Sequence, residues 1–164
     1  MKARRYRGFT LLEMLVVVGV IAILSLAALP SYMDRIVRKQ IEESLPLAAL
    51  AQAPVALAWG LTQAFPADNA AAGLPPADRI VGNQISAVAV QDGAIHMTFG
   101  NTVAGSLKGK ILSIRPAVVE DAPIVPVAWV CGNAAVPDKM TVKGENRTSV
   151  PNLFLPLECA ARKR

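Results

Sequence analysis

The sequence has little of the chemistry on which enzymes and metal proteins depend. His96 is the only histidine, and the two cysteines, Cys131 and Cys159, form no C-x-x-C motif. Neither a glycine-rich phosphate loop nor a nucleophile elbow is visible, and no ligand cluster with metal-site spacing occurs. Aromatic residues make up 5% of the chain, which gives little support to electron conduction through stacked rings. We therefore expect no enzyme, no catalytic residue, no metal and no cofactor.

The net charge is also small outside the N-terminus. The formal net charge is +5, but Lys2, Arg4, Arg5 and Arg7 fall within the first eight residues, which leaves thirteen basic against twelve acidic side chains. The basic excess therefore lies mostly in the N-terminal segment, where it acts as a targeting signal. It is weak evidence that the rest of the chain binds DNA.

A long apolar run follows this basic segment. Residues 9–29 span 21 positions with one charge, Glu13. As a helix they would reach roughly 30 Å, about the thickness of a bilayer core. A carboxylate in hydrocarbon is costly and is usually retained for a function. Its position predicts assembly, in which Glu13 meets a positive partner on another copy of the chain.

The alternative interpretation of this run is a secretory signal peptide. Cleavage after Ala27, at Ser25-Leu26-Ala27, would release a soluble exported binding domain. Two observations disfavour it: Glu13 has no evident use in a signal peptide, and an amphipathic helical pattern continues beyond the cleavage point. Its apolar positions are Met33, Ile36, Val37, Ile41 and Leu45. Pro30 predicts a kink between the two parts, and Pro46 and Pro54 each predict a bend or a break farther on.

The segment Arg7-Gly8-Phe9-Thr10-Leu11-Leu12-Glu13 resembles the prepilin signature of type IV pilins. The resemblance implies that a membrane peptidase cuts between Gly8 and Phe9 and methylates the new amine of Phe9. It implies that Glu13 is the assembly carboxylate and that Pro30 kinks the helix. Pairing with the amine of a neighbouring copy would remove the free-energy cost of burying the Glu13 carboxylate only when the two copies are offset by one distance along the helix axis. The pairing would thereby set the register of a helical polymer.

The rest of the chain predicts an α+β fold. A long N-terminal helix, half membrane-spanning and half amphipathic, is expected to pack on a four-stranded antiparallel sheet. The strand candidates are 85–91, 94–99, 110–115 and 126–130, with a tight turn at Asp92-Gly93. The expected core residues of the later strands are Ile95, Met97, Phe99, Leu112, Ile114, Val127 and Trp129, and His96 is expected at the surface. The similarity to type IVa pilins implies a C-terminal region closed by a Cys131–Cys159 disulfide, the alternative being two buried free thiols.

These expectations divide the chain into segments. They are a leader peptide at 1–8, a transmembrane and assembly helix at 9–30, an amphipathic helix half at 31–62, a connecting loop at 63–84, the sheet at 85–130 and the disulfide-bonded region at 131–164.

The function that the resemblance implies is that of a structural subunit, the major pilin, in a type IV pilus. Such filaments support adhesion, twitching motility and, as a further candidate, DNA uptake by natural transformation. The alternative within the superfamily is a minor pilin or a type II secretion pseudopilin. The implied partners are copies of the same chain, the prepilin peptidase, the inner-membrane assembly platform and minor pilins. Before assembly the subunit would cross the inner membrane once with its C-terminal domain in the periplasm, and after assembly it would be extracellular.

One set of basic residues is a candidate DNA-binding patch. It consists of Lys139, Lys143, Arg147, Arg162, Lys163 and Arg164. In a filament this patch would repeat with every subunit, so weak contacts would add by avidity. The alternative is a solvated charged end that keeps the filament soluble.

Overall fold

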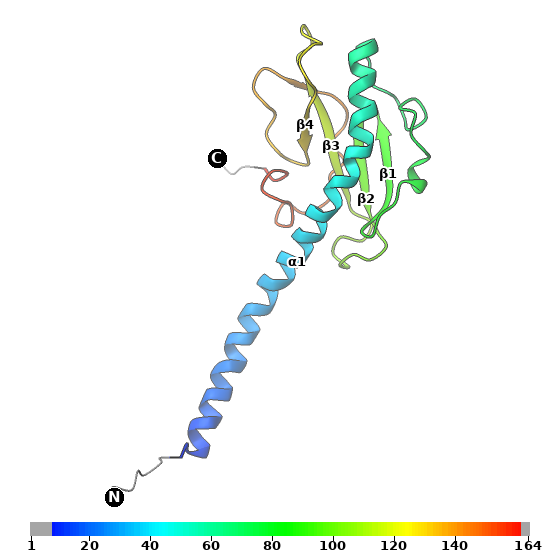
Figure 1. The fold of residues 1–164 in the computed structure, drawn as a ribbon. Helices are drawn as coiled ribbons and strands as arrows, with labels where there is room; N and C mark the ends of the chain where they lie inside the picture. Colours follow the sequence, from blue (N-terminus) through cyan, green and yellow to red (C-terminus); the bar gives the residue numbers. More distant parts are fainter. Residues whose placement is uncertain (1–7, 162–164) are drawn as a thin grey trace, which may run out of the picture. The chain divides into compact units, whose positions relative to one another are not determined.

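The computed structural model describes residues 8–161, except for the side chains of residues 26–31. The chain divides into two units, residues 1–35 and 36–164. Helix α1 (Leu11–Thr62) begins in the first unit and ends in the second, where it lies across one face of a β-sheet (Figure 1).

The helix is continuous at both of the prolines that predict a bend or break in its second half. Pro46 and Pro54 lack the N–H that would bond the carbonyls of Glu42 and Leu50, four residues earlier. Both Glu42 and Leu50 are exposed, so water can bond the freed carbonyls. The expected break is therefore absent because the missing hydrogen bonds fall on the solvent side of the helix.

The sheet consists of the strands β1 (Ile85–Gln91), β2 (Ala94–Phe99), β3 (Ile111–Val118), β4 (Ala128–Cys131) and β5 (Thr141–Val142). It is antiparallel with the order β1-β2-β3-β4, and the short strand β5 adds to β3. The predicted hairpin is present, and its turn has φ of 47° at Asp92 and 80° at Gly93. Positive φ at both positions is typical of the turn that matches strand twist. β3 runs three residues beyond its predicted end, and β5 was not expected.

The core lies between the inner face of α1 and the sheet. The fully buried residues of α1 include Ile41, Ala48, Ala51 and Val55, which face Val88, Ile95, Met97, Phe99 and Leu112 of the sheet. Of the helical stripe predicted from the sequence, Val37 and Ile41 are buried and Leu45 packs against the core. Met33 is 54% exposed, so its place in the stripe was wrong. The predicted core residues of β2 are all buried. In β4 the buried residue is Val130, whereas Trp129 is half-buried against the core and Val127 precedes the strand. The prediction for β4 was therefore partly wrong, because the strand begins two residues later than its apolar pattern indicated.

The connection between α1 and β1 contains one short 3-10 helix, η1 (Ala77–Arg79). Asn69 ties this connection to the exposed edge of β1. Its side-chain amide donates to the carbonyls of Pro75 at 2.8 Å and Val88 at 3.0 Å, and its Oδ1 accepts from the Val90 N–H at 2.6 Å. The side chain therefore occupies the place that another strand would take, which protects the edge from pairing with other chains.

Candidate assembly site

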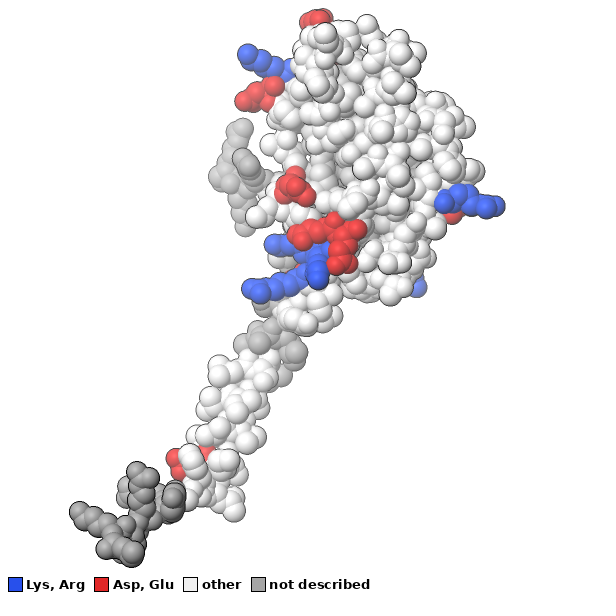
Figure 2. Space-filling model, viewed as in Figure 1, with Lys and Arg blue, Asp and Glu red and all other residues white. Residues whose placement is uncertain are grey.

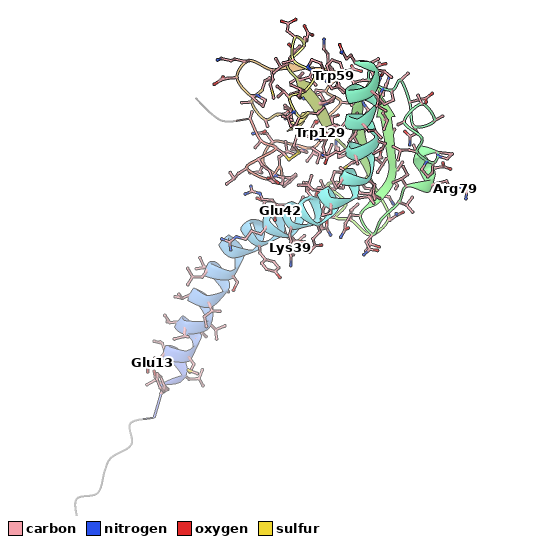
Figure 3. The ribbon with its side chains drawn as sticks, turned by 45° about the horizontal axis from the view of Figure 1, so that its top comes forward. Glu13, Lys39, Glu42, Trp59, Arg79 and Trp129 are labelled. Carbon is pink, nitrogen blue, oxygen red and sulfur yellow. A yellow bond between two sulfur atoms is a disulfide. The ribbon has the colours of Figure 1, made fainter. Side chains whose placement is uncertain are left out.

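The first unit is a helix without internal partners for its apolar side chains. In the described residues from Phe9 to Leu24, the large apolar side chains are 44–84% exposed. Glu13 is the only ionisable side chain between Gly8 and Ser25, and Figure 3 shows it at the start of the helix. A helix that is apolar on all sides is buried in a larger assembly or in a membrane.

Two stretches of α1 are apolar enough to consider as membrane segments. They are Leu11–Ser25 and the longer Tyr32–Thr62, whose most apolar window has a mean hydropathy of 1.4. The longer stretch begins with six charged residues between Asp34 and Glu43, and its later part packs on the sheet. The first unit is the part of the described helix whose exposed surface is apolar on all sides, and the prediction that it holds the membrane segment stays a prediction.

Local geometry gives Glu13 a second role. The helix begins at Leu11, and the Glu13 N–H donates to Oγ1 of Thr10 at 3.2 Å. Thr10 and Glu13 thus have the T-x-x-E spacing of a capping box, in which the cap side chain bonds the third helical N–H. A carboxylate in the first turn also interacts favourably with the helix dipole. This signal was readable in the sequence, but our sequence reasoning did not use it.

The processing residues lie immediately before the helix. Gly8 and Phe9 are both exposed outside α1, and the Phe9 side chain is 75% exposed. The basic leader residues before Gly8 lie outside the described residues, and so does the side chain of Pro30. Cleavage between Gly8 and Phe9 and a kink at Pro30 therefore stay predictions.

A charged band marks the part of α1 where the second unit begins. The Lys39 ammonium lies 3.7 Å from the Glu43 carboxylate, one turn apart on the helix, with Glu42 beside them. Arg38 reaches the other way and its Nη2 donates to the Leu153 carbonyl at 2.8 Å. This last bond attaches the C-terminal region to the helix.

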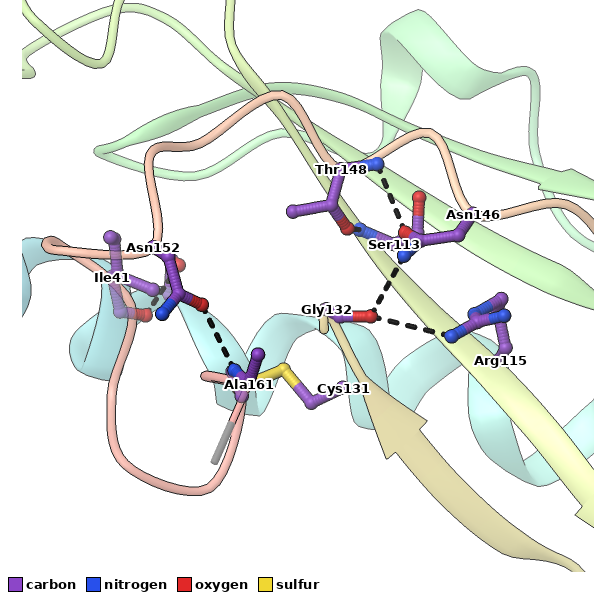
Figure 4. The surroundings of a disulfide bond; sticks show 11 residues. Ile41, Ser113, Arg115, Cys131, Gly132, Asn146, Thr148, Asn152 and Ala161 are labelled. Atoms are coloured by element: carbon purple, nitrogen blue, oxygen red, sulfur yellow. Dashed lines mark hydrogen bonds between the residues drawn. A yellow bond between two sulfur atoms is a disulfide. The ribbon is translucent and has the colours of Figure 1, made fainter. Parts of the chain in front are cut away.

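The C-terminal region is closed by the Cys131–Cys159 disulfide (Figure 4). Asn133 N–H donates to the Cys159 carbonyl at 2.8 Å, and Asn146 Nδ2 donates to the Gly132 carbonyl at 3.1 Å. Cys159 is fully buried in the core. Because Cys131 and Cys159 are bonded to each other, the alternative of two buried free thiols is wrong.

Residues 143–149, which we call the strap, cross the face of the sheet that α1 does not cover. The strap is held by the Lys143 N–H on the Pro116 carbonyl, the Arg147 N–H on Ser113 Oγ and the Ser149 N–H on the Ile111 carbonyl, each at 2.9 Å. Beneath it lies His96, which is 5% exposed and whose Nδ1 is 2.9 Å from Ser113 Oγ.

The prediction that His96 lies at the surface was therefore wrong. It does alternate outward from the core, but the strap covers that face. Burial, followed by the nearby Arg147 charge, lowers the pKa of His96, while Glu145 acts in the opposite direction. Ser113 and His96 resemble two members of a hydrolase triad, but Ser113 is fully buried, so no substrate reaches it.

Three residues of the predicted basic patch, Lys139, Lys143 and Arg147, lie in the described part of the chain. Lys143 pairs with Glu120, and Arg147 Nε pairs with the Glu145 carboxylate at 2.8 Å. Lys139 is exposed on a turn with φ of 64°. Arg162, Lys163 and Arg164 lie outside the described residues. Because Lys143 and Arg147 are paired with carboxylates, less of their positive charge is available to bind the phosphate backbone of DNA.

Comparison with known proteins gave two family matches. A family model described as pilin (bacterial filament) matches residues 37–160, and a model of the prokaryotic N-terminal methylation motif matches residues 3–29. Together the two matches cover both the assembly segment around Glu13 and the disulfide-closed body.

Individual relatives agree with these matches. The fimbrial protein EcpC of Eikenella corrodens is 33% identical over 134 residues, covering 79% of this chain and 84% of the relative. A type IV major pilin protein PilE1 of Neisseria gonorrhoeae is 29% identical over 160 residues, covering 93% and 86%. A fimbrial protein of Neisseria meningitidis serogroup B is 28% identical over 144 residues, covering 87% and 82%.

Proposed function

Because the chain belongs to the pilin family of bacterial filaments, and is therefore a structural, self-polymerising subunit processed by a prepilin peptidase, we propose that Glu13 sets the axial offset between copies. The observation that supports this proposal is the solitary charge of Glu13 on an exposed, otherwise apolar helix. In a bundle of such helices an unpaired carboxylate would cost several kcal/mol or become protonated.

The partner that we propose for Glu13 is the α-amine of Phe9 on the next copy. Cleavage after Gly8 creates this amine, which stays cationic when methylated. Phe9 lies four residues before Glu13, so a neighbour displaced outward by about 6 Å along the helix axis would bring its amine level with Glu13. Any other displacement leaves both charges in apolar surroundings. The pairing therefore selects one offset and repeats it without closing, which produces a filament.

The capping box offers a competing explanation for Glu13, and the two can be separated. A glutamine at position 13 can still accept a hydrogen bond as a capping-box residue, but it carries no charge. We therefore compare Glu13→Gln with Thr10→Ala, which removes the cap and keeps the charge, and with Glu42→Gln, which neutralises an exposed carboxylate outside the apolar segment.

The measurement is the amount of sheared surface filament at equal cellular levels of processed subunit. Charge pairing predicts that Glu13→Gln loses filaments, whereas Thr10→Ala and Glu42→Gln retain them. If Glu13→Gln assembles normally and Thr10→Ala does not, Glu13 is a capping residue and the proposal fails. Mass spectrometry of the mature N-terminus tests the processing step, for which we expect methylated Phe9.

Within this function we propose the abundant role, because several relatives are themselves named major pilin proteins. The filament would support adhesion and twitching motility, with the assembly platform and minor pilins as partners. The subunit is a membrane-anchored chain that becomes an extracellular pilus, and we propose a periplasmic C-terminal domain before assembly. A rare band for this chain in sheared filaments would favour the minor-pilin alternative instead.

DNA uptake remains a separate proposal, supported by the basic residues Lys139 and Arg162–Arg164. Filter binding of DNA by purified filaments, before and after replacement of the three tail residues by glutamine, tests it. An unchanged signal would remove this activity without affecting the structural role.

A further inference from the structure

The outer face of the second half of α1 is apolar although it faces solvent. Residues 44–67 contain no charged side chain, yet Leu50, Leu57 and Leu61 are 60%, 63% and 75% exposed. At 100° per residue these three lie within about 40° of one another around the helix. We call them the leucine stripe. Figure 2 shows that the charged side chains on this face gather before this part of the helix, where the visible surface is uncharged.

A helix packed on a sheet by one face ordinarily carries charged residues on the other. The inner face here is occupied, because Ala48, Ala51 and Val55 are fully buried against the sheet. The leucine stripe has no partner among the described residues. A continuous exposed apolar surface of this kind marks an interaction site.

A second exposed apolar surface lies at the opposite end of the same unit. In the C-terminal loop, residues 150–160, the side chains of Leu155 and Cys159 are buried while Leu153 and Leu157 are 62% and 86% exposed. The disulfide and the bond from Arg38 Nη2 to the Leu153 carbonyl hold this loop level with the first part of α1 in the unit. The two leucines are therefore presented on a fixed support.

We infer that, in the filament, the leucine stripe of one copy packs against Leu153 and Leu157 of another copy farther from the membrane. This inference rests on the proposed function, because it needs copies of the chain that are displaced from one another along the filament and repeat without closing. Leu153 lies level with Arg38, so residues 50–61 of the stripe lie about 18–34 Å beyond it along the helix.

A second copy displaced by about 18–34 Å along this part of the helix would therefore place its loop level with the stripe. Each subunit presents its stripe to an outer copy and its loop to an inner one. Such a head-to-tail contact between two different surfaces repeats without closing, as the polymer requires.

Crosslinking of intact filaments tests the contact directly. The variant carries Leu57→Cys and Leu157→Cys in the full chain, and filaments are treated with a short bis-maleimide, which leaves the native disulfide unreacted. We expect a ladder of covalent multimers from filaments and monomers from detergent-dispersed subunits. The matched control pairs Leu57→Cys with Ile124→Cys, because Ile124 is 92% exposed but lies on the β3–β4 connection. A ladder from the control equal to that from the test pair would overturn the inference.

A charge exchange provides the second test. Because Leu57 and Leu157 are exposed, Leu57→Lys should leave the monomer folded, which tryptophan fluorescence checks. We expect Leu57→Lys to reduce filament yield by about tenfold or more, since apolar burial is lost at every repeat, and Leu157→Glu to restore it in the double variant.

The outcomes also separate this inference from the proposed function. Normal filaments from Leu57→Lys would overturn the contact between the leucine stripe and the C-terminal loop, and so would a loss of filaments that Leu157→Glu does not restore. In either case Glu13→Gln still tests separately whether Glu13 sets the offset between copies. Normal filaments from Glu13→Gln instead remove the proposed role of Glu13 whatever the stripe does.

Discussion

Replacing Asn69 by alanine tests how the edge of the sheet is held. The substitution removes three hydrogen bonds, two donated to carbonyls and one accepted from the Val90 N–H. Val88 and Val90 are 0% and 4% exposed, so water cannot readily replace the lost partner. At about 1 kcal/mol for each bond, the free energy of unfolding should fall by about 3 kcal/mol.

Urea unfolding of the full chain in mild detergent measures this loss. Trp59 and Trp129 are the only tryptophans and both lie in the second unit, so their fluorescence reports on the sheet and its helix. With a slope of about 1.5 kcal/mol per molar urea, the midpoint should fall by about 2 M. Phe65 stacks on Trp59 with ring centroids 4.7 Å apart, which also makes the signal sensitive to release of the connecting segment.

Asn83 supplies the matched control. It is exposed, and its side chain makes no hydrogen bond among the described residues. Asn83→Ala should change the free energy of unfolding by no more than about 0.5 kcal/mol. A loss below about 1 kcal/mol for Asn69→Ala would show that water or a local shift replaces the three bonds, and the account of the protected edge would be wrong.

Three further predictions concern the C-terminal region and His96, which the strap covers. Replacing both cysteines by alanine opens a loop of sequence separation 28, and the free energy of unfolding should fall by about 3.5 kcal/mol in the chain-entropy model. Urea unfolding measures this loss, and equal midpoints for the variant and the wild type would contradict a stabilising role of the disulfide. Because the pKa of His96 is lowered in the folded state, first by burial and then by Arg147, its contribution to stability is complete above the unfolded value near 6.5 and is lost as the pH falls below it. The unfolding midpoint should therefore decline between about pH 7 and pH 5 more steeply in the wild type than in His96→Gln, and parallel curves would exclude His96 as the cause. Gly144 has φ of 77°, and a Cβ there would lie 2.5 Å from the Ala94 Cβ; Gly144→Ala should lower stability by about 1–3 kcal/mol, and hydrogen exchange should show faster exchange of the strap amides.

The N-terminal half of the molecule could be predicted in most respects from local sequence. An apolar run, followed by apolar residues spaced three and four apart, is enough to predict a long helix whose second half packs on the core by one face. The assembly role of Glu13 stays a prediction. The alternation in β2 and the Asp-Gly turn likewise predicted the hairpin. These patterns are readable because periodicity along one element reports which side of it meets the core.

Longer-range packing caused the errors. His96 alternates outward as predicted, but a segment some fifty residues later crosses over it, and no periodic signal in that segment indicates where it will cross. β4 was misplaced because a short strand with apolar residues on both sides has no clear alternation. The continuity of α1 depends on which carbonyls face water, which two prolines alone do not indicate.

The sequence by itself therefore determined the long helix, the single charge in its first, apolar half and the alternating strands, since each follows from the spacing of neighbouring residues. Only the tertiary structure decided that Asn69 closes the edge of β1, that the strap buries His96, and that leucines remain exposed at both ends of the second unit. Those features depend on contacts between residues distant in the chain, whose meeting is set by how the whole chain folds back over the sheet.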